Sequence, residues 1–464
     1  MIHIPKHPNI KDIPTAINQL IDIDFDFSTL INNNLLEKIN HKQFLFLIGI
    51  AAFEGIYFSK NMEFIKKYIN KIDKKNLNLL LELELNLHNI FLKKYETEET
   101  YNKFYLFFSG LYPVNNLNID NKPITRILFY VPNPVFLAHT NPLFYMLKQR
   151  KDKNVEVSIA SRGYNEEFKK KCNKLGVKFY DIAESELSLS FKKLKEISEK
   201  YDRIIWQSVP VHLAYFRSIS NKVCYWSFKF HPAVTDLRKY LGSFNVDQKH
   251  IYYNLIKWEN IDVGFQIKNK NTKTIEWQDR KLKFGSFCRE ELIDDEQYWK
   301  TVKVILENNN GSFYHYCGRK EIHVKWCEVL KINSANIKFL GWLKKPEAKL
   351  KEMAFLLDGF KLGHGYLALE AMAASIPIVF PNSRSSYGTL ENYLIKTLRF
   401  FDIKDKNQYL KKYLLSFNAE KDLKVLSTSL LTDYSFNRFY GDHYKDVILS
   451  IREDKFEDFV NLIF

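Results

Sequence analysis

This sequence of 464 residues has few cysteines, glycines and prolines, and it lacks a long apolar run. Its five cysteines, at positions 172, 224, 288, 317 and 327, are odd in number and form no Cys-x-x-Cys pair. That spacing argues against a disulfide framework and against a zinc site, and it favours a reducing compartment. The low counts of glycine (16) and proline (13) accompany an abundance of Lys, Asn, Ile, Phe and Tyr, to which we assign no functional meaning.

A membrane-spanning segment and a leader peptide are also missing from the pattern. The most apolar run, Phe44–Phe58, contains Glu54 and is too short to cross a bilayer. The first residues, MIHIPKHPNIKDIP, do not follow the basic and then apolar order of a signal peptide. We therefore expect a cytoplasmic protein.

Acidic residues are in the minority, 54 against 69 basic ones, which gives a net charge of +15. This excess admits nucleic acid, an anionic membrane surface or a phosphorylated small ligand as a partner. The lysines are spread along predicted helices, and no basic cluster is interleaved with aromatic residues, so a nucleic-acid site is not expected. A solvated basic surface explains the charge, and contact with a membrane surface stays open.

Apolar residues make up 46% of the chain, and its length predicts two or three domains with buried cores. From Thr15 to Leu111 apolar residues recur at helical spacing without a fixed repeat, as at positions 80, 83, 87 and 90. We expect an all-helical N-terminal domain over residues 1–118, acting either as a scaffold or as an acceptor-binding module.

After a polar joint at 115–122, short apolar strands alternate with helices, which is typical of parallel sheets with crossover helices. A first Rossmann-like domain, residues 119–278, has strands expected at 126–131, 155–160, 178–180, 203–206 and 223–227. A second, residues 279–464, has strands expected at 284–287, 312–317, 337–339, 354–357 and 376–380, and only helices after Tyr387. Two such domains would bind ligands at the carboxyl ends of their strands.

The stretch 355–381 carries the clearest candidate site. Gly363 and Gly365 let the backbone come close to a ligand, and the helix expected from Tyr366 directs its first N–H groups at that point. Such a helix N-terminus favours anions, most often phosphate. Glu370, about one turn into the helix, can accept hydrogen bonds from ribose hydroxyls. The alternative is a strand–helix–strand unit whose glycines only make tight turns.

This stretch resembles the C-terminal half of GT-B glycosyltransferases, where Glu-Ala-Met-Ala-x-Gly-x-Pro-Val-Val closes the nucleotide-sugar site. Here the pattern reads Glu-Ala-Met-Ala-Ala-Ser-Ile-Pro-Ile-Val over 370–379. The approach, Leu-Asp-Gly-Phe at 357–360 and then Gly-His-Gly at 363–365, is similar to one branch in particular. That branch contains protein O-GlcNAc transferase and the bacterial cytoplasmic N-glycosyltransferases. The resemblance is specific over 355–381 and diffuse elsewhere.

The resemblance implies an α/β GT-B fold, with two facing Rossmann-like domains after the all-α N-terminal domain. The first of them, residues 119–278, would be on the acceptor side, and the second, residues 279–464, would bind the nucleotide sugar and carry C-terminal helices. It implies transfer of a hexose from a nucleoside diphosphate sugar, UDP-linked, with no further cofactor. His139, which follows the first strand, and His231, in Phe-His-Pro-Ala at 230–233, match cleft histidines of the branch and are the candidate catalytic residues. Each also fits a loop histidine with a structural role.

The donor-binding candidates lie at strand ends of the second Rossmann-like domain. Arg289 can offer a bidentate fork to the diphosphate oxygens. The turns after the next two strands resemble those that hold the nucleotide base, and Trp342 fits either that role or ordinary core packing. The full set of candidates is Arg289, Gly318, Gly341, Trp342, Gly363, His364, Gly365, Tyr366 and Glu370.

Two absences bear on mechanism. Leu362 stands where many retaining GT-B enzymes have a second glutamate, which favours inversion, and no Asp-x-Asp motif stands clear as a metal site. We expect inverting, metal-independent chemistry.

A long helical domain before a GT-B pair is the arrangement of the bacterial N-glycosyltransferases, which implies a protein or peptide acceptor modified on Asn or Ser/Thr. The rival functions are transfer to a cell-surface glycan or glycolipid, and nucleotide binding without turnover.

Overall fold

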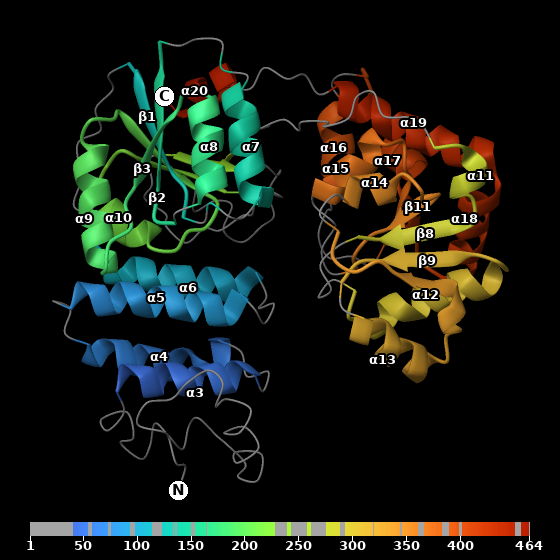
Figure 1. Ribbon diagram of the computed structural model, residues 1–464, viewed down its shortest axis with the longest axis horizontal. Helices are drawn as coiled ribbons and strands as arrows, with labels where there is room; N and C mark the ends of the chain where they lie inside the picture. Colours follow the sequence, from blue (N-terminus) through green and yellow to red (C-terminus); the bar gives the residue numbers. More distant parts are fainter. Residues whose placement is uncertain are drawn as a thin grey trace, which may run out of the picture. The chain divides into compact units, whose positions relative to one another are not determined.

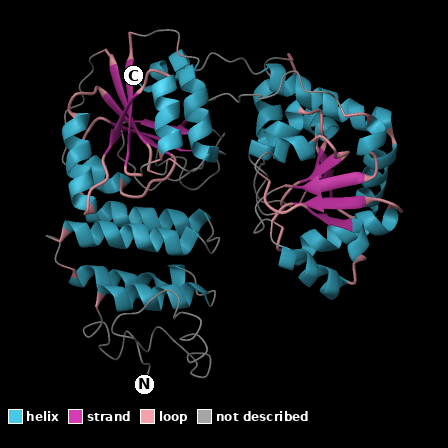
Figure 2. Cartoon of the chain, in the orientation of Figure 1, coloured by secondary structure: helices cyan, strands magenta, loops and turns pink. Residues whose placement is uncertain are grey.

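The structure is a computed structural model in which the chain forms two compact units. The residues it describes are 40–53, 58–72, 76–92, 98–113, 123–132, 134, 137–148, 150, 154–163, 165–227, 239–242, 258–260, 275–287, 293–318, 320–343, 346–360, 366–382, 389–398, 401–450 and 456–463. Unit 1 comprises Met1–Val263 together with Asp454–Phe464, and unit 2 comprises Gly264–Glu453. Each unit contains one sheet with helices packed around it (Figures 1 and 2).

Unit 1 is built on a seven-stranded sheet in the order β3-β2-β1-β4-β5-β6-β7, and all neighbouring strands are parallel. Its strands are β1 (Arg126–Tyr130), β2 (Glu156–Ser161), β3 (Lys178–Asp181), β4 (Arg203–Gln207), β5 (Val223–Ser227), β6 (Lys239–Gly242) and β7 (Trp258–Asn260). Its crossover helices are α7 (Leu137–Lys148), α8 (Glu166–Lys174), α9 (Leu187–Ser198) and α10 (Leu213–Ile219).

Helices cover both faces of this sheet, because successive side chains of a strand point to opposite faces. Leu128 and Tyr130 share a buried cluster with α9 and α10, whereas Ile127 and Phe129 share another with α7 and α8. The second cluster also holds the last helix, α20 (Phe456–Ile463). The ring of Phe459 lies 5.6 Å from that of Phe129. The end of the chain therefore packs on the first sheet.

Four further helices of unit 1 form two layers beside α9 and α10, and only the nearer layer contacts them (Figure 1). They are α3 (His41–Phe53), α4 (Phe58–Lys71), α5 (Leu77–Leu92) and α6 (Glu98–Leu111). Helix α5 contacts α9, α6 contacts α10, and α3 and α4 pack on α5 and α6 respectively. Their apolar side chains belong to the same buried cluster as Trp206 of β4, so this helical segment and one face of the sheet share a core.

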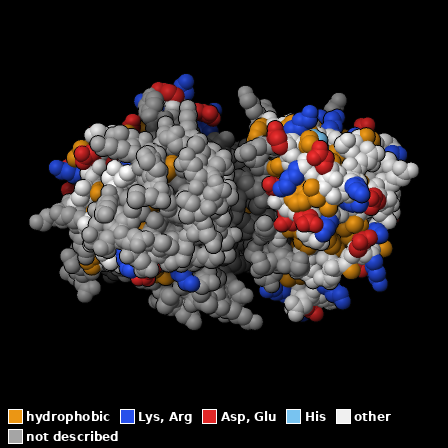
Figure 3. Space-filling view, turned by 90° about the horizontal axis from the view of Figure 1, so that it is seen from below, with side chains coloured by type: hydrophobic (Ala, Val, Ile, Leu, Met, Phe, Trp, Pro, Cys, Tyr) orange, Lys and Arg blue, Asp and Glu red, His pale blue; other side chains and the backbone are white. Residues whose placement is uncertain are grey.

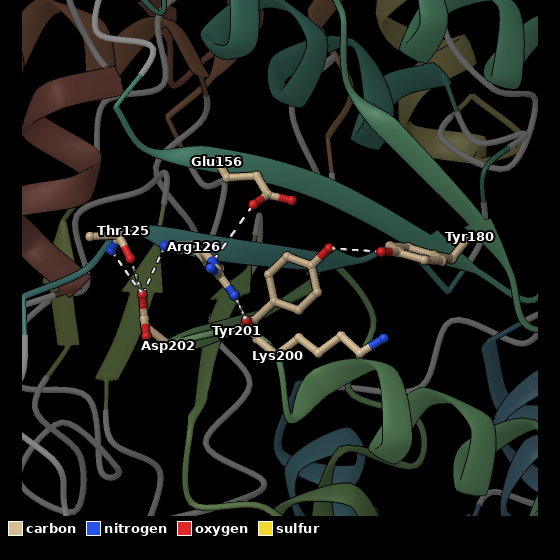
Figure 4. A network of polar contacts seen from close by, with 7 residues as sticks. All are labelled: Thr125, Arg126, Glu156, Tyr180, Lys200, Tyr201 and Asp202. Atoms are coloured by element: carbon tan, nitrogen blue, oxygen red, sulfur yellow. Dashed lines mark hydrogen bonds and ion pairs between the residues drawn. The ribbon is translucent and has the colours of Figure 1, made fainter.

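A network of polar contacts lies at the amino edge of the first sheet, where β1, β2 and β4 begin (Figure 4). A carboxylate oxygen of Asp202 accepts hydrogen bonds from the backbone N–H groups of Thr125 and Arg126, both at 2.8 Å. Burial alone would raise the pKa of Asp202, but these N–H donors and the Thr125 hydroxyl outweigh it and lower that pKa. The network is structural, because ligands of such sheets bind at the opposite, carboxyl edge.

Unit 2 is built on a six-stranded parallel sheet in the order β10-β9-β8-β11-β12-β13. Its strands are β8 (Lys283–Ser286), β9 (Phe313–Tyr316), β10 (Ile337–Phe339), β11 (Phe355–Leu357), β12 (Ile378–Pro381) and β13 (Leu415–Phe417). Its helices are α11 (Trp277–Arg280), α12 (Glu296–Asn308), α13 (Lys320–Leu330), η5 (Ser334–Asn336), α14 (Pro346–Leu350), α15 (Tyr366–Ala373), α16 (Thr389–Thr397), α17 (Lys406–Tyr413), α18 (Glu420–Thr432) and α19 (Tyr434–Ser450).

The two faces of this sheet also carry separate buried clusters. One holds side chains of α12, α13 and α18, and the other holds side chains of α14 to α17 and of α19. On the surface of unit 2, lysines form ion pairs with acidic residues, as in Lys300–Glu296 (2.9 Å) and Lys325–Asp294 (3.0 Å). The face of unit 2 visible in Figure 3 shows this mixture of signs. Across the described residues, no helix has both the length and the apolar character needed to cross a bilayer.

The strand and helix alternation expected from the sequence is confirmed, and the fold class is α/β with two parallel sheets. The strand predictions at 223–227 and 337–339 coincide with β5 and β10. One expectation is wrong: the chain after Tyr387 is not purely helical, because Leu415–Phe417 forms β13 and pairs with β12. Three residues are too few to show an alternating pattern between two helices. Strands β6 and β7 were also not anticipated.

Helix α15 ends in a left-handed residue that is not glycine. Ser375 has φ 57°. Its N–H donates to the carbonyl of Met372 (3.1 Å), and the N–H of Ile376 donates to the carbonyl of Ala371 (2.9 Å), which together form a Schellman motif. Glycine is the usual residue at this position, and the GT-B sequence pattern has glycine there.

We expect Ser375→Gly to raise the free energy of unfolding of unit 2 by about 1 kcal/mol, because glycine adopts the left-handed conformation without the steric cost of a Cβ atom. Denaturant unfolding of the full chain measures it. The matched control is Ser429→Gly within α18, where glycine should instead lower the stability by a few tenths to about 1 kcal/mol. A loss of stability in Ser375→Gly would contradict the expectation.

Candidate functional site

The carboxyl ends of the parallel strands of unit 2 meet at one edge of the sheet. The residues described there are Phe287 after β8, Cys317 and Gly318 after β9, Leu340 to Trp342 after β10, and Asp358 to Phe360 after β11. Ligands of doubly wound sheets bind outside this edge. These residues are therefore a candidate donor-binding site, which we call the donor edge.

Glycines turn the chain at two points of the donor edge. Gly318 has φ 130° and Gly341 has φ 65°, both in the region that L side chains rarely adopt. A Cβ atom at Gly341 would meet nothing within 4 Å, so its requirement for glycine is conformational. Trp342 follows directly and is 70% exposed, which excludes the core-packing alternative for this residue. Its indole offers an apolar face for a planar ligand group at this edge.

A buried carboxylate fixes the chain where it leaves β11. Asp358 is fully buried, and its Oδ1 accepts a hydrogen bond from the N–H of Gly359 at 2.9 Å. Its own N–H donates to the carbonyl of Val379 in the neighbouring strand β12, at 2.8 Å. Polar contacts on both sides of Asp358 therefore hold the chain at the end of β11. The sequence pattern Leu-Asp-Gly-Phe is the signal for this residue.

Helix α15 begins at Tyr366, as expected, and Glu370 lies on its second turn. Glu370 is half-buried, while Ala368 and Met372 on the same helix are fully buried. The N-terminal end of a helix carries a partial positive charge and unpaired N–H groups, which suit a phosphate. The turn with Gly363, His364 and Gly365 and the side chain of Tyr366 lie outside the described residues.

Helix α19 holds the other end of α15 through a backbone contact. A Cβ atom added at Gly441 would lie 2.8 Å from the carbonyl carbon of Ser375 and closer still to its oxygen. No side chain therefore fits between α19 and the end of α15. This contact fixes the position of the helix that carries Glu370.

The roles of the remaining predicted residues are not tested by the structure. His139 lies in the first turn of α7 rather than in the preceding loop, and its side chain is outside the described part. His231 and Arg289 are also outside it. Across the described ranges, no group of three or more His, Cys, Asp or Glu side chains is placed to hold a metal ion.

Unit 1 contains a buried cluster of polar residues that was not predicted from the sequence. Helix α5 contributes Glu84 and His88, and the turn between β4 and α10 contributes His212; all three are buried. Burial raises the pKa of Glu84 to about 8 and lowers that of His212 to about 4. A glutamate and a histidine spaced by four residues beside an apolar helix face are the only sequence signal, and a solvated face would give the same pattern.

Comparison with solved structures identifies the architecture. An O-GlcNAc transferase mutant from Thermobaculum terrenum matches with a TM-score of 0.64 and 11% identity, covering 97% of this chain and 86% of that one. Anabaena HepE in complex with UDP and glucose matches at 0.51 and 12%, covering 73% and 98%. TarM matches at 0.53 and 13%, covering 74% and 100%. The chain has the GT-B fold.

At these identities the likeness concerns the GT-B fold alone. No protein-family model matches the sequence, and no curated protein matches it. Units 1 and 2 contain the two Rossmann-like sheets of this GT-B chain, and the donor edge with helix α15 lies in the second. The expectation of a GT-B fold, made from residues 355–381, is confirmed.

Proposed function

We propose that this GT-B chain is a glycosyltransferase that moves a hexose of the glucose or GlcNAc type from a UDP-linked donor to a protein. The observation that carries the proposal is the placement of Glu370 one turn into α15, the helix that follows β11 along the chain of a GT-B fold. Solved structures of the same fold support it, since Anabaena HepE was solved with UDP-glucose and an S. aureus TarM mutant with UDP and α-GlcNAc-glycerol.

The donor would bind at the donor edge of unit 2. Glu370 would accept hydrogen bonds from the ribose hydroxyls, and Trp342 with the turns at Gly318 and Gly341 would hold the base. The first N–H groups of α15, the glycine turn before it and Arg289 would neutralise the leaving diphosphate. No metal ion is assigned to this step.

Transfer would proceed with inversion in one displacement. The acceptor atom attacks C1 of the sugar on the face opposite the diphosphate, the bond from C1 to the diphosphate oxygen breaks, and the electron pair leaves with UDP. The proton of the acceptor passes to a neutral imidazole, which we assign to His139, with His231 as the second cleft histidine. Transfer should fade as the pH falls through about 6.5, where an unperturbed imidazole becomes protonated.

A protein or peptide acceptor, modified on Asn or Ser/Thr in the cytoplasm, fits the arrangement of the chain. The likeness to the O-GlcNAc transferase covers 97% of this chain, whereas those to HepE and TarM cover 73% and 74%. A cell-surface glycan or glycolipid is the second candidate acceptor, since the lipopolysaccharide galactosyltransferase WaaB also shares the fold, at a TM-score of 0.51. A nucleotide-binding protein without turnover is the alternative from another class.

The deciding experiment is mass spectrometry of cellular proteins after co-expression with the full chain, compared with His139→Ala. We expect hexose on protein with the wild type and a strong loss with the variant. Sugar found on lipid or oligosaccharide but never on protein would eliminate the protein acceptor. Failure to turn over any UDP- or GDP-sugar, with EDTA or with Mg²⁺, would favour the binding protein. Full transfer by His139→Ala would eliminate only the assignment of His139 as the group that receives the proton.

A further inference from the structure

Helix α5 forms two hydrogen bonds with the turn between β4 and α10. The Oε1 atom of Glu84 accepts from the backbone N–H of His212 at 2.7 Å. The Nε2 atom of the His212 ring lies 2.8 Å from the carbonyl oxygen of Leu81, to which it donates. Glu84 is 1% exposed and His212 is 5% exposed. Hydrogen bonds to buried groups of this kind are costly to lose.

The turn that is hydrogen-bonded to α5 contains two residues with left-handed backbone conformations. Ser208 has φ 76° and His212 has φ 63°, and neither is glycine. Left-handed residues with side chains persist only where the surroundings hold them, and they gather at functional sites. Here the N–H of Ser208 donates to the carbonyl of Trp226 at 2.7 Å, and the hydroxyl of Tyr225 donates to the carbonyl of Ser208 at 2.9 Å.

The turn lies at the kind of position where parallel α/β sheets generally bind ligands. It follows the carboxyl end of β4, which pairs with β1, and the strand order changes direction between these two strands. Such a switch point opens a crevice at the carboxyl edge. Helix α5 holds a second segment after the same edge, because Asn78 Oδ1 accepts from the N–H of Leu187 at 2.8 Å, at the start of α9.

We propose that Glu84 and His212 couple the helical segment to the β4–α10 turn, so that α5 positions this turn for the acceptor side of the reaction. Glu84 is a positioning residue in this account, because it acts through the backbone of the turn. The reaction is that of the proposed function, on which this part of the inference rests. The coupling itself is a property of the described structure.

The charge states of the cluster suit a coupling between neutral groups. Glu84 acts on Tyr112 after α6, and His212 acts on His88 of α5 and is acted on by Arg162 after β2. Tyr215 on α10 acts on Tyr112. Burial is the main cause that lowers the pKa of His88, to about 3, with His212 adding to it. The Oε2 atom of Glu84 has no hydrogen-bond partner among the described residues, so an ionised carboxylate would be poorly stabilised there.

The pH dependence follows from these directions. Glu84 keeps its proton in the folded chain up to about pH 8, against a usual value of 4.5, so its contribution to stability is full below 4.5 and is lost as the pH rises towards 8. His88 and His212 act oppositely: their contribution is present above 6.5 and is lost as the pH falls towards 4 and below. Between pH 6.5 and 8, Glu84 alone should loosen the coupling.

Hydrogen exchange of the full-length protein tests the coupling without any substrate. In Glu84→Ala we expect the protection factor of the amides of residues 208–213 to fall about tenfold, which is the loss of one buried hydrogen bond of about 1.4 kcal/mol. Glu84→Gln keeps the acceptor oxygen and should restore protection. In the wild type this protection should fall as the pH rises towards about 8, and in Glu84→Gln it should not. The control is Glu63→Gln, at an exposed position on α4.

Kinetics test the positioning. Glu84→Ala should raise KM for the acceptor about tenfold and leave the affinity for UDP unchanged, with Glu84→Gln close to the wild type. Unchanged protection at 208–213 in Glu84→Ala overturns the proposal, and so does lost protection with an unchanged acceptor KM in an active enzyme. If the wild type transfers no sugar, the proposed function fails, and the exchange result still decides the coupling.

Discussion

Replacing Gly441 by alanine is expected to lower the free energy of unfolding of unit 2 by about 3 kcal/mol, the upper part of the usual range for an overpacked core. The added Cβ atom would lie well inside van der Waals distance of the backbone at Ser375. A backbone carbonyl at the end of α15 cannot rotate away as a flexible side chain would. Helix α19 must therefore move off α15, which also breaks apolar packing around Tyr444 and Val447.

Denaturant unfolding of the full chain, followed separately for the two units by hydrogen exchange, measures this loss. Gly110→Ala in α6 is the matched control, because a Cβ atom there would meet nothing within 4 Å. Alanine is the better helix former, so this control should be neutral or raise stability by up to about 1 kcal/mol. Equal stability of Gly441→Ala and the wild type would show that α19 and α15 are not in backbone contact.

Replacing Glu370 by alanine is expected to weaken UDP binding by about 1.5–3 kcal/mol, the range for hydrogen bonds to a charged group. This corresponds to a loss of affinity of roughly 10- to 150-fold. Isothermal titration of the full chain with UDP measures it, and Glu420→Ala, on the surface at the start of α18, serves as the control. Affinity equal to that of the wild type in a folded Glu370→Ala variant would remove Glu370 from the site.

A donor analogue without ribose hydroxyls tests the hydrogen bonds that we assign to Glu370. The wild type should bind UDP more tightly than 2′,3′-dideoxy-UDP, because the analogue lacks the ribose hydroxyls. Glu370→Ala should bind the two with similar affinity, since the partner of those hydroxyls is gone. Equal discrimination by both proteins would place the contact of Glu370 elsewhere on the nucleotide.

Much of the architecture could be predicted because the central strands, such as β4, β11 and β12, are buried on both faces. Strands of this kind consist of short unbroken apolar runs, as in Val223–Ser227, and they stand out between amphipathic helices. The end of the chain was harder to predict, since β13 is three residues long and lies between two helices. Glu370 could be placed one turn into its helix because the glycine turn before Tyr366 predicts where that helix begins.

Other properties of the candidate site depend on contacts that no local pattern reports. The exposure of Trp342 is an example, because a tryptophan after a strand fits both the core and the surface until its neighbours are known. The contact of helix α19 with the backbone at Ser375 is another, because nothing local indicates that Gly441 must leave room for it.

By itself, the sequence determined the fold class and the alternation of strands and helices, and it singled out the stretch 355–381 as the candidate donor site. These follow from periodicity and from residue types whose effect on the backbone is local. The tertiary structure alone decided that Glu84 meets His212, 128 positions further along the chain. Periodicity tells which side of a helix is buried and says nothing of what covers it, so a buried carboxylate and a surface one look alike until the chain has folded.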